Sequence, residues 1–258
     1  MKRFEGKTAV VTGGAQGIGL ATADRLFAEG ANVFIADIKK WDGSAASQKL
    51  TLGDRIAYRR TDVSVAAQVE AMMAAAEARF GAIDVLVSNV GVARSTPFLD
   101  LAEDEIEAGF RMNLFSMIWC CQAAIRRMRA RRKGGAVVLM SSVNAVMTMP
   151  GFAIYNCTKG GVEQLTRVLS LEFADDSIRV NAVGPGTILT ELAKNAVLGD
   201  EASRRRILSR TPLKRFGEPE EVASAVAFLA SDDASYITGE TIFIDAGRRA
   251  LNYTVSVD

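Results

Sequence analysis

The chain has 258 residues, and 31 lysines and arginines against 30 aspartates and glutamates give it a formal net charge of +1. This length is enough for one large core, so we expect a single domain over residues 1–258. The balanced charge argues against nucleic acid or an anionic membrane as a partner. The first apolar run is too short for a signal segment or a membrane span, so we expect a cytoplasmic protein.

Histidine is absent from the chain. Its absence excludes a Ser-His-Asp triad, a histidine general base and histidine-ligated zinc. The cysteines, Cys120, Cys121 and Cys157, lack metal-ligand spacing, so we expect reduced, buried thiols and no metal site. Acid–base chemistry near neutral pH must therefore use tyrosine, lysine, a carboxylate or cysteine.

Short β-branched runs alternate along the chain with longer helical segments. Strands are predicted at 8–12, 32–36, 56–60, 85–88, 136–140, 179–183 and 241–244. Helices are predicted at 17–30 with Gly30 as the C-cap, at 64–80 with Ser64 as the N-cap, at 103–132 and at 160–173. Several strands are apolar throughout, which is typical of strands buried on both faces. The pattern predicts an α/β fold with a doubly wound parallel sheet of about seven strands and helices on both faces.

A glycine-rich loop, Thr12-Gly13-Gly14-Ala15-Gln16-Gly17-Ile18-Gly19, follows the first predicted strand and leads into a helix. Glycines in this position let a pyrophosphate approach backbone N–H groups at a helix N-terminus. The spacing of Gly13, Gly17 and Gly19 differs from the generic G-x-G-x-x-G pattern. The loop alone therefore leaves two interpretations open, a nucleotide site and a simple tight turn.

Asp37 closes the second predicted strand, at the interval from Gly17 that places an acid at the ribose hydroxyls. A carboxylate accepts hydrogen bonds from both hydroxyls and repels a 2′-phosphate, so the predicted cofactor is NAD, with NADP the less favoured choice. Lys39 and Lys40 complicate this prediction because either could reach a 2′-phosphate. A solvated aspartate at the end of a strand is the alternative interpretation.

Tyr155 and Lys159 lie four residues apart in a helical pattern, so their side chains are expected to share a helix face. A phenol has a pKa of about 10, and an ammonium within about 4–6 Å can lower it by roughly 1–3 units. The pair could therefore transfer protons, and a surface helix pair is the alternative. Ser142 follows the strand predicted at 136–140, at the strand end where ligands gather in such sheets.

Taken together and in order, these motifs resemble the short-chain dehydrogenase/reductase family. The motifs that carry the resemblance are Thr12-Gly13-x-x-x-Gly17-x-Gly19, Asp62, Ser88-Asn89-Val90-Gly91, Asn113, Ser142, Tyr155 with Lys159, and Asn181 through Pro185-Gly186. The resemblance covers nearly the whole chain. It implies a Rossmann-like fold and an enzyme that moves a hydride between a nicotinamide cofactor and a secondary alcohol or its ketone.

The resemblance also implies roles for individual residues. Tyr155 would act as acid or base on the substrate oxygen, Ser142 would hydrogen-bond that oxygen, and Lys159 would hold the nicotinamide ribose. Asn113 would support a proton relay through water, and Asp62 would hold the adenine amino group. The implied cofactor contacts are Gly13, Gln16, Gly17, Ile18, Gly19, Asp37, Asp62, Val63, Asn89, Gly91, Tyr155, Lys159, Pro185, Gly186, Ile188 and Thr190. Family members usually form homotetramers, and residues 187–216 would form a substrate lid.

Two segments depart from the family pattern. The usual Asn-Asn-Ala-Gly reads Ser88-Asn89-Val90-Gly91 here, and the usual Asp-Gly-Gly reads Asp245-Ala246-Gly247. Neither departure affects a catalytic position.

For the substrate, the stretch at 185–188 and those near 210–219 resemble the sugar and polyol dehydrogenases of the family. An NADP-dependent 3-oxoacyl-thioester reductase is the alternative, and a non-catalytic dinucleotide-sensing binding protein is an alternative of another class. Arg204, Arg205 and Arg206 are interpreted as a solvated helix face and not as a site for an anionic substrate.

Overall fold

The computed structural model describes residues 2–41, 52–190 and 201–257. In these residues, seven strands form one parallel sheet in the order β3-β2-β1-β4-β5-β6-β7. The strands are β1 (Thr8–Thr12), β2 (Asn32–Asp37), β3 (Ile56–Arg60), β4 (Val85–Ser88), β5 (Gly135–Met140), β6 (Ile178–Pro185) and β7 (Thr241–Ile244). The predicted doubly wound α/β fold is confirmed, and the observed strands differ from the predicted ones by at most two residues at an end.

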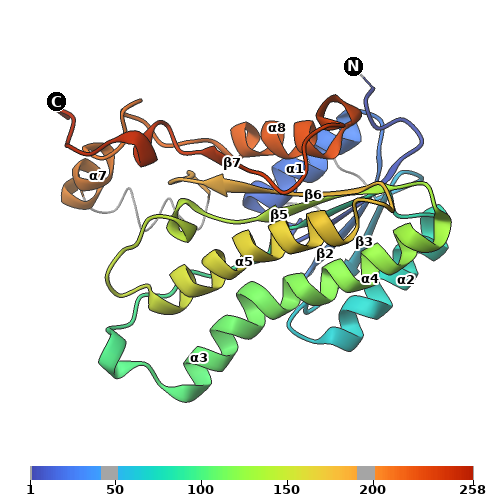
Figure 1. Cartoon of the computed structure of the whole chain (residues 1–258), viewed down its shortest axis with the longest axis horizontal. Helices are drawn as coiled ribbons and strands as arrows, with labels where there is room; N and C mark the ends of the chain where they lie inside the picture. The colour runs from blue at the N-terminus through green and yellow to red at the C-terminus, as the bar shows by residue number, and fades with distance from the viewer. Residues whose placement is uncertain (1, 42–51, 191–200, 258) are drawn as a thin grey trace.

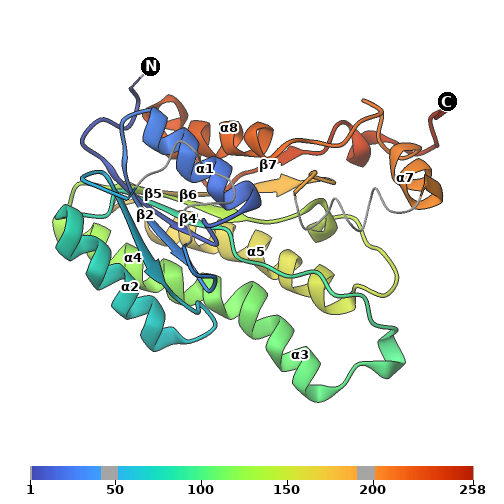
Figure 2. The same cartoon turned by 180° about the vertical axis from the view of Figure 1, so that it is seen from behind.

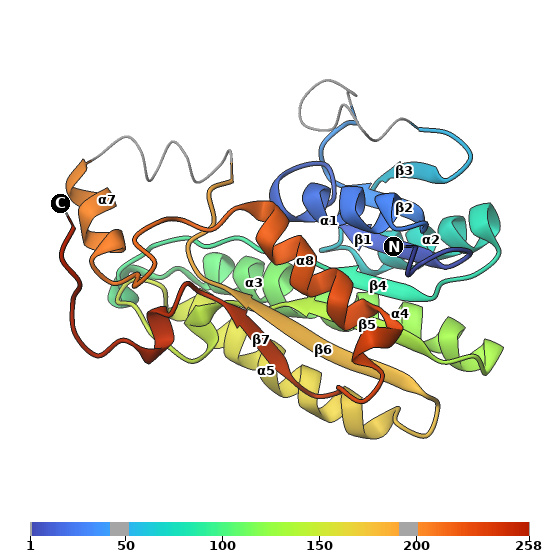
Figure 3. The ribbon, with the colours of Figure 1, turned by 90° about the horizontal axis from the view of Figure 1, so that it is seen from above.

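The sheet lies between two layers of helices (Figures 1 and 2). The helices in the described residues are α1 (Gly17–Ala28), α2 (Ala66–Phe80), α3 (Glu103–Phe110), α4 (Ser116–Arg131), α5 (Ala153–Glu172), α7 (Glu201–Leu208) and α8 (Pro219–Ala230). Helices α1 and α8 pack together on one face, and α2, α4 and α5 cover the other (Figure 1). Helix α7 and the C-terminal tail lie together at one end of the molecule (Figure 3).

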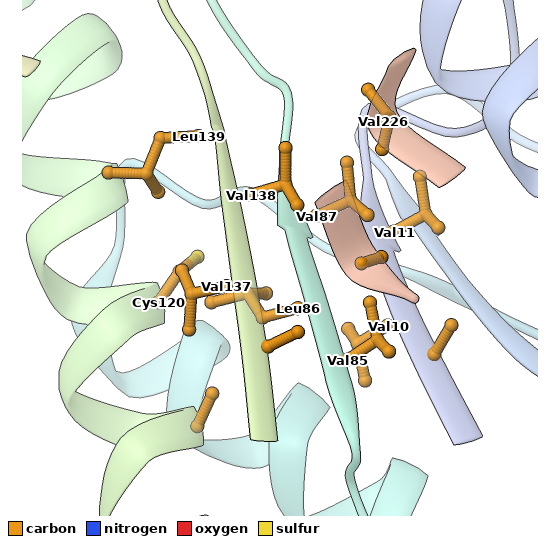
Figure 4. Close-up of a cluster of buried hydrophobic side chains, with 14 of the residues drawn as sticks. Val10, Val11, Val85, Leu86, Val87, Cys120, Val137, Val138, Leu139 and Val226 are labelled. Atoms are coloured by element: carbon orange, nitrogen blue, oxygen red, sulfur yellow. The ribbon is translucent and has the colours of Figure 1, made fainter. Parts of the chain in front are cut away.

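The core follows from the apolar central strands. Figure 4 shows valines of β1 and β4 pointing to both faces of the sheet, where Cys120 of α4 covers one face and Val226 of α8 the other. Every residue of β1 and β4 is buried. β-branched side chains suit such a doubly covered, pleated surface, which is why these short runs form central strands.

The structure corrects two local predictions. Helix α2 begins at Ala66 with Val65 at its N-cap, and the hydroxyl and N–H of Ser64 donate to Asp62 Oδ1 instead of capping the helix. Cys120 and Cys121 are buried as predicted, whereas Cys157 is exposed. Cys157 lies on a helix face that no other described element covers closely enough to bury it.

The long helix predicted at 103–132 contains a π-helical turn at Arg111–Phe115, which separates α3 from α4. Such wide turns insert one extra residue in a helical turn and occur frequently at functional sites. The sequence did not predict this turn, and it contains Asn113.

The predicted lid over 187–216 lies partly outside the described residues, which stop at 190 and resume at 201. Among the helices that are described, none is long and apolar enough to cross a lipid bilayer.

Candidate active site

A cleft of about 580 Å³ opens at the carboxyl ends of β1, β2, β4, β5 and β6. In a sheet of this order, β1 and β4 are neighbours at the point where the strand order reverses, and ligands bind outside that point. The predicted site residues that line the cleft are Gly13, Gln16, Gly17, Ile18, Asp37, Asp62, Val63, Asn89, Gly91, Ser142, Tyr155, Lys159, Pro185, Gly186, Ile188 and Thr190. The remaining two, Gly19 and Asn113, lie behind the cleft wall.

The glycine loop is held tightly beneath the cleft. Asn89 donates its side-chain N–H groups to the carbonyl oxygens of Thr12 and Gly13, at 3.1 and 3.2 Å. A Cβ atom at Gly19 would overlap the carbonyl oxygen of Gly13 and lie 2.7 Å from Asn89 Nδ2. Only glycine therefore fits at position 19, and the first turn of α1 stays open to an anion at its N-terminus.

Asp37 and Lys39 both line the cleft at the carboxyl end of β2. Asp37 is buried, and its two carboxylate oxygens accept backbone N–H groups of Ala15 and Lys39 at 3.1 and 3.0 Å. The Lys39 ammonium lies 2.5 Å from Gln16 Oε1. The carboxylate is therefore fixed beside the glycine loop, and Lys39 lines the same part of the cleft.

Helix α5 places Tyr155 and Lys159 on one face, beside Ser142 at the end of β5. The Lys159 side chain is only 2% exposed, and its Nζ donates to the carbonyl oxygen of Met140 at 2.6 Å. Nζ also lies 5.7 Å from the centre of the Tyr155 ring. Ser142 Oγ accepts the backbone N–H of Asn144 at 3.1 Å. The predicted pair thus faces one cleft and not the outer surface.

Burial sets the acidity of both groups. It lowers the pKa of Lys159 to about 8, because a desolvated ammonium is disfavoured. Burial also raises the pKa of Tyr155, and the hydrogen bond with Ser142 opposes this only in part. The expectation that the ammonium lowers the pKa of the phenol is therefore wrong for this structure, since desolvation is the larger effect and Nζ bonds Met140 and not the phenol.

Asn113 fixes the chain that follows β4. It is 2% exposed, and its side-chain amide accepts from Val92 N at 2.7 Å and donates to Val92 O at 2.9 Å. A Cβ atom at Gly91 would lie 3.1 Å from Lys159 Nζ and 3.5 Å from Asn113 Oδ1. The backbone at Gly91 therefore passes directly over the buried lysine.

Comparison with known proteins identifies the family of the chain. A family profile described as "Enoyl-(Acyl carrier protein) reductase" matches residues 13–249. The L-rhamnose 1-dehydrogenase (NAD(P)(+)) of Sphingomonas sp. (strain SKA58) is 38% identical over 250 residues, which are 96% of this chain and 98% of that protein. The chain belongs to the short-chain dehydrogenase/reductase family.

Two further similar proteins illustrate the range of this short-chain dehydrogenase/reductase family. The 3-oxoacyl-(acyl-carrier-protein) reductase FabG of Chlamydia trachomatis is 39% identical, over 93% of this chain and 96% of that protein. The crystal structure of levodione reductase is 32% identical with a TM-score of 0.86, over 96% of this chain and 99% of that chain. The chain is accordingly an enzyme that acts on CH–OH groups with NAD(P).

The cleft of this short-chain dehydrogenase/reductase fits a dinucleotide. The glycine loop leaves space at a helix N-terminus, which suits a pyrophosphate. The buried carboxylate of Asp37 suits hydroxyl groups, and Lys159 lines the same cleft.

Sequence reasoning missed a buried acid beneath the catalytic group. Glu163, one helical turn beyond Lys159, is 5% exposed. Its carboxylate accepts the hydroxyls of Ser141 at 2.5 Å and Thr241 at 2.7 Å. It thereby fastens α5 to the ends of β5 and β7. The only sequence signal was an acid on the helix face that carries Tyr155 and Lys159.

Proposed function

We propose that this enzyme is an NAD(H)-dependent dehydrogenase that interconverts a secondary alcohol, of the sugar or polyol class, and the corresponding ketone. The observation that supports this most strongly is the buried Lys159 beside Tyr155 and Ser142, in the same cleft as Asp37. A buried cation, a phenol and a hydroxyl around one position suit the stabilisation of a developing oxyanion.

We assign the acid–base step to Tyr155. In the direction of reduction, its hydroxyl donates a proton to the carbonyl oxygen of the substrate, and the hydroxyl of Ser142 hydrogen-bonds the same oxygen. In the direction of oxidation, Tyr155 accepts the proton of the alcohol. A bound nicotinamide cofactor supplies or accepts the hydride. Because burial raises the pKa of Tyr155, its neutral form is favoured at neutral pH, so oxidation should speed up in alkaline solution.

We assign the other predicted site residues to positioning and cofactor contact. Lys159 would hold the nicotinamide ribose through its ammonium, and Asp62 would hold the adenine amino group. Each polar group of the Asn113 amide makes one hydrogen bond to Val92, so the water relay expected from Asn113 would use its remaining hydrogen-bonding capacity. The relay stays a prediction.

The preference for NAD is part of the proposal. The Asp37 carboxylate is held beside the glycine loop, where it would accept the ribose hydroxyls and repel a 2′-phosphate. Lys39 lines the same part of the cleft and could bind a 2′-phosphate, which favours NADP. One similar enzyme is named for both cofactors, which supports a preference for NAD that is partial and not absolute.

Two other functions compete with this proposal. A 3-oxoacyl-thioester reductase using NADP is supported by the similarity to FabG and by Lys39. A dinucleotide sensor without catalysis requires a broken catalytic set, whereas Ser142, Tyr155, Lys159 and Asn113 are all present. The sugar or polyol class is supported by the similarity to L-rhamnose 1-dehydrogenase.

The deciding experiment combines a substrate screen with one variant. Sugars, polyols, hydroxy acids and cyclic alcohols are assayed with NAD and NADP at alkaline pH. Tyr155→Phe should bind NADH as wild type does and lose about 10²- to 10⁴-fold in kcat, the usual contribution of a positioned acid–base group. Equal kcat values for the variant and wild type would reject the assignment.

The chain's organisation and assembly remain predictions of the sequence. We propose a single domain in a homotetramer located in the cytoplasm. Light scattering of the purified protein at micromolar concentration tests the tetramer, and a monomer there contradicts it.

A further inference from the structure

A second cavity, of about 630 Å³, lies beside the residues that follow Ser142. It is lined by Val143, Asn144, Met147, Thr148, Met149, Arg210, Arg248, Leu251, Asn252, Tyr253 and Thr254. None of these residues belongs to the set that lines the dinucleotide cleft. We call this space the tail cavity, because the last four of its residues are in the C-terminal tail.

The tail cavity is connected to the catalytic residues through its walls. Asn144 donates its backbone N–H to Ser142 Oγ and its side-chain N–H to Asn156, the neighbour of Tyr155. On the opposite side, Arg248 donates to Thr187 Oγ1 at 3.3 Å, and Thr187 follows Gly186 of the dinucleotide cleft. The tail cavity therefore adjoins Ser142 and Asn156, and in the proposal below it is the space that receives the part of the substrate remote from the reacting oxygen.

The lining of the tail cavity is positively charged. Its lining contains two arginines and no aspartate or glutamate. Arg248 Nε is buried without a hydrogen-bond partner in the part of the chain that the structure describes. Within the same ranges, no carboxylate forms an ion pair with Arg210. A buried donor without an acceptor typically costs about 1–3 kcal/mol, and an acceptor supplied by a ligand that reaches this guanidinium would recover part of that cost.

The charge of Arg210 acts on Arg248. Burial lowers the pKa of Arg248, and the nearby positive charge of Arg210 lowers it further. Asp245 opposes this effect, but its carboxylate is already bound by the side chain of Arg249 and by the backbone N–H groups of Gly247 and Arg249. An anion between the two guanidinium groups would relieve their repulsion.

Backbone contacts hold the cavity wall in place. Val255 N–H donates to the carbonyl oxygen of Ser209 at 2.8 Å, next to Arg210. Arg205 of α7 donates to the carbonyl oxygen of Val257 at 2.8 Å. The tail is therefore tied to α7, which brings Arg210 and Arg248 to the same space although 38 positions separate them in the sequence.

We propose that the tail cavity binds a carboxylate carried by the alcohol or ketone substrate, with Arg210 and Arg248 as the anion-binding residues. Guanidinium groups bind carboxylates through paired, charge-assisted hydrogen bonds. The substrate is then a hydroxy or keto acid. This inference rests on the proposed hydride transfer and adds a carboxylate to the secondary alcohol or ketone substrate. The site differs from Arg204–Arg206 of the sequence, where Arg204 pairs with Glu201 and Arg205 binds the tail.

The test compares acids with matched neutral compounds. The pairs are gluconate with sorbitol, and 4-acetylbenzoate with 4-acetylbenzamide, so that polyhydroxylated and apolar bodies are distinguished. For at least one pair, kcat/KM for the acid should exceed that for the neutral compound by about tenfold or more, the range of one charge-assisted contact. The Arg210→Met and Arg248→Met variants should each lose this preference through a higher KM.

The controls separate this inference from the proposed function. Arg206→Met, an exposed position of α7 outside the cavity, should keep the preference. Arg210 is exposed, so its variant should fold even if Arg248→Met does not, and circular dichroism checks both. Turnover of neutral compounds as fast as the acids would overturn the inference and leave the proposed function intact.

If no compound of the panel is turned over, the result counts against the proposed function. A binding measurement then still tests the carboxylate site. Calorimetry with 4-acetylbenzoate, in the presence of NAD, should show binding to wild type that weakens about tenfold in Arg210→Met. Equal affinity of both proteins for 4-acetylbenzoate, or equal affinity of wild type for the acid and the amide, overturns the inference.

Discussion

The ammonium of Lys159 donates a 2.6 Å hydrogen bond to the backbone carbonyl oxygen of Met140, the last residue of β5. The contact joins α5 to the carboxyl end of β5, the side of the sheet on which the catalytic residues lie. It also holds a positive charge in a nearly solvent-free position, since the side chain is 2% exposed. A buried charge with one neutral acceptor costs stability, and this cost is the basis of the first prediction.

Lys159→Met should abolish activity and make the protein more stable at pH 7. Burial lowers the pKa of Lys159 to about 8, whereas the unfolded chain keeps the ordinary value of 10.5. Below pH 8 the buried ammonium destabilises the native wild type by up to about 3 kcal/mol, and the variant removes this cost. The variant also leaves the Met140 carbonyl oxygen without a donor, which destabilises it by about 1–2 kcal/mol. We expect a net gain of about 1–2 kcal/mol in the free energy of unfolding, measured by urea denaturation.

The pH dependence of this gain has a definite sign. Between pH 8 and 10.5 the unfolded chain binds the proton and the native protein does not, so wild type gains stability as pH rises. The advantage of Lys159→Met should therefore shrink between pH 7 and 9.5. Lys133→Met, an exposed control, should show neither the gain nor its pH dependence. A variant less stable than wild type at pH 7 contradicts the prediction.

Asp37→Ala should change cofactor preference. Loss of the carboxylate removes an acceptor for the ribose hydroxyls and a repulsion of the 2′-phosphate, so kcat/KM should fall at least tenfold with NAD and rise or stay level with NADP. Lys39→Met should lower kcat/KM with NADP only. Lys40→Met, exposed and outside the cleft wall, is the control and should change neither. Parallel losses with both cofactors in Asp37→Ala would count against the assignment.

Glu163→Gln should destabilise the protein. The side chain does not line the cleft, so the substitution removes no direct contact with the substrate or the cofactor. The carboxylate accepts two hydroxyls, and replacing a charged acceptor weakens both bonds, so we expect a loss of about 1–2 kcal/mol. Chemical denaturation measures it. Glu172→Gln, an exposed position on the same helix, should stay within about 0.5 kcal/mol. A loss no larger than that of this control would show that the buried carboxylate contributes nothing to stability.

Ala246→Gly should stabilise the protein. Ala246 has a φ of 55°, a left-handed conformation that costs a residue with a Cβ about 1–2 kcal/mol. Glycine removes this strain but has more entropy to lose on folding, so we expect a net gain of about 0.5–1 kcal/mol, observed as a higher Tm. Ala130→Gly, at an exposed position of α4, should act in the opposite direction. A lower Tm for Ala246→Gly is the contradicting result.

The sequence determined the architecture and most of the cleft wall, because these depend on local patterns. Apolar runs that fill both faces of a strand predict a covered parallel sheet, and the glycine loop after β1 marks the strand end where a cleft opens. The spacing of Tyr155 and Lys159 by one helical turn placed them on one face, since helix periodicity alone decides that.

Only the tertiary structure decided the energetics and the long-range partners. The direction of the pKa shift of Tyr155 depends on how deeply the neighbouring elements bury it, which no interval in the sequence states. The π-helical turn at Asn113 and the left-handed Ala246 follow from packing that overrides local preference. Arg210 and Arg248 share a cavity because the tail folds back on α7, and desolvation and distance between remote segments arise only once the whole chain has packed.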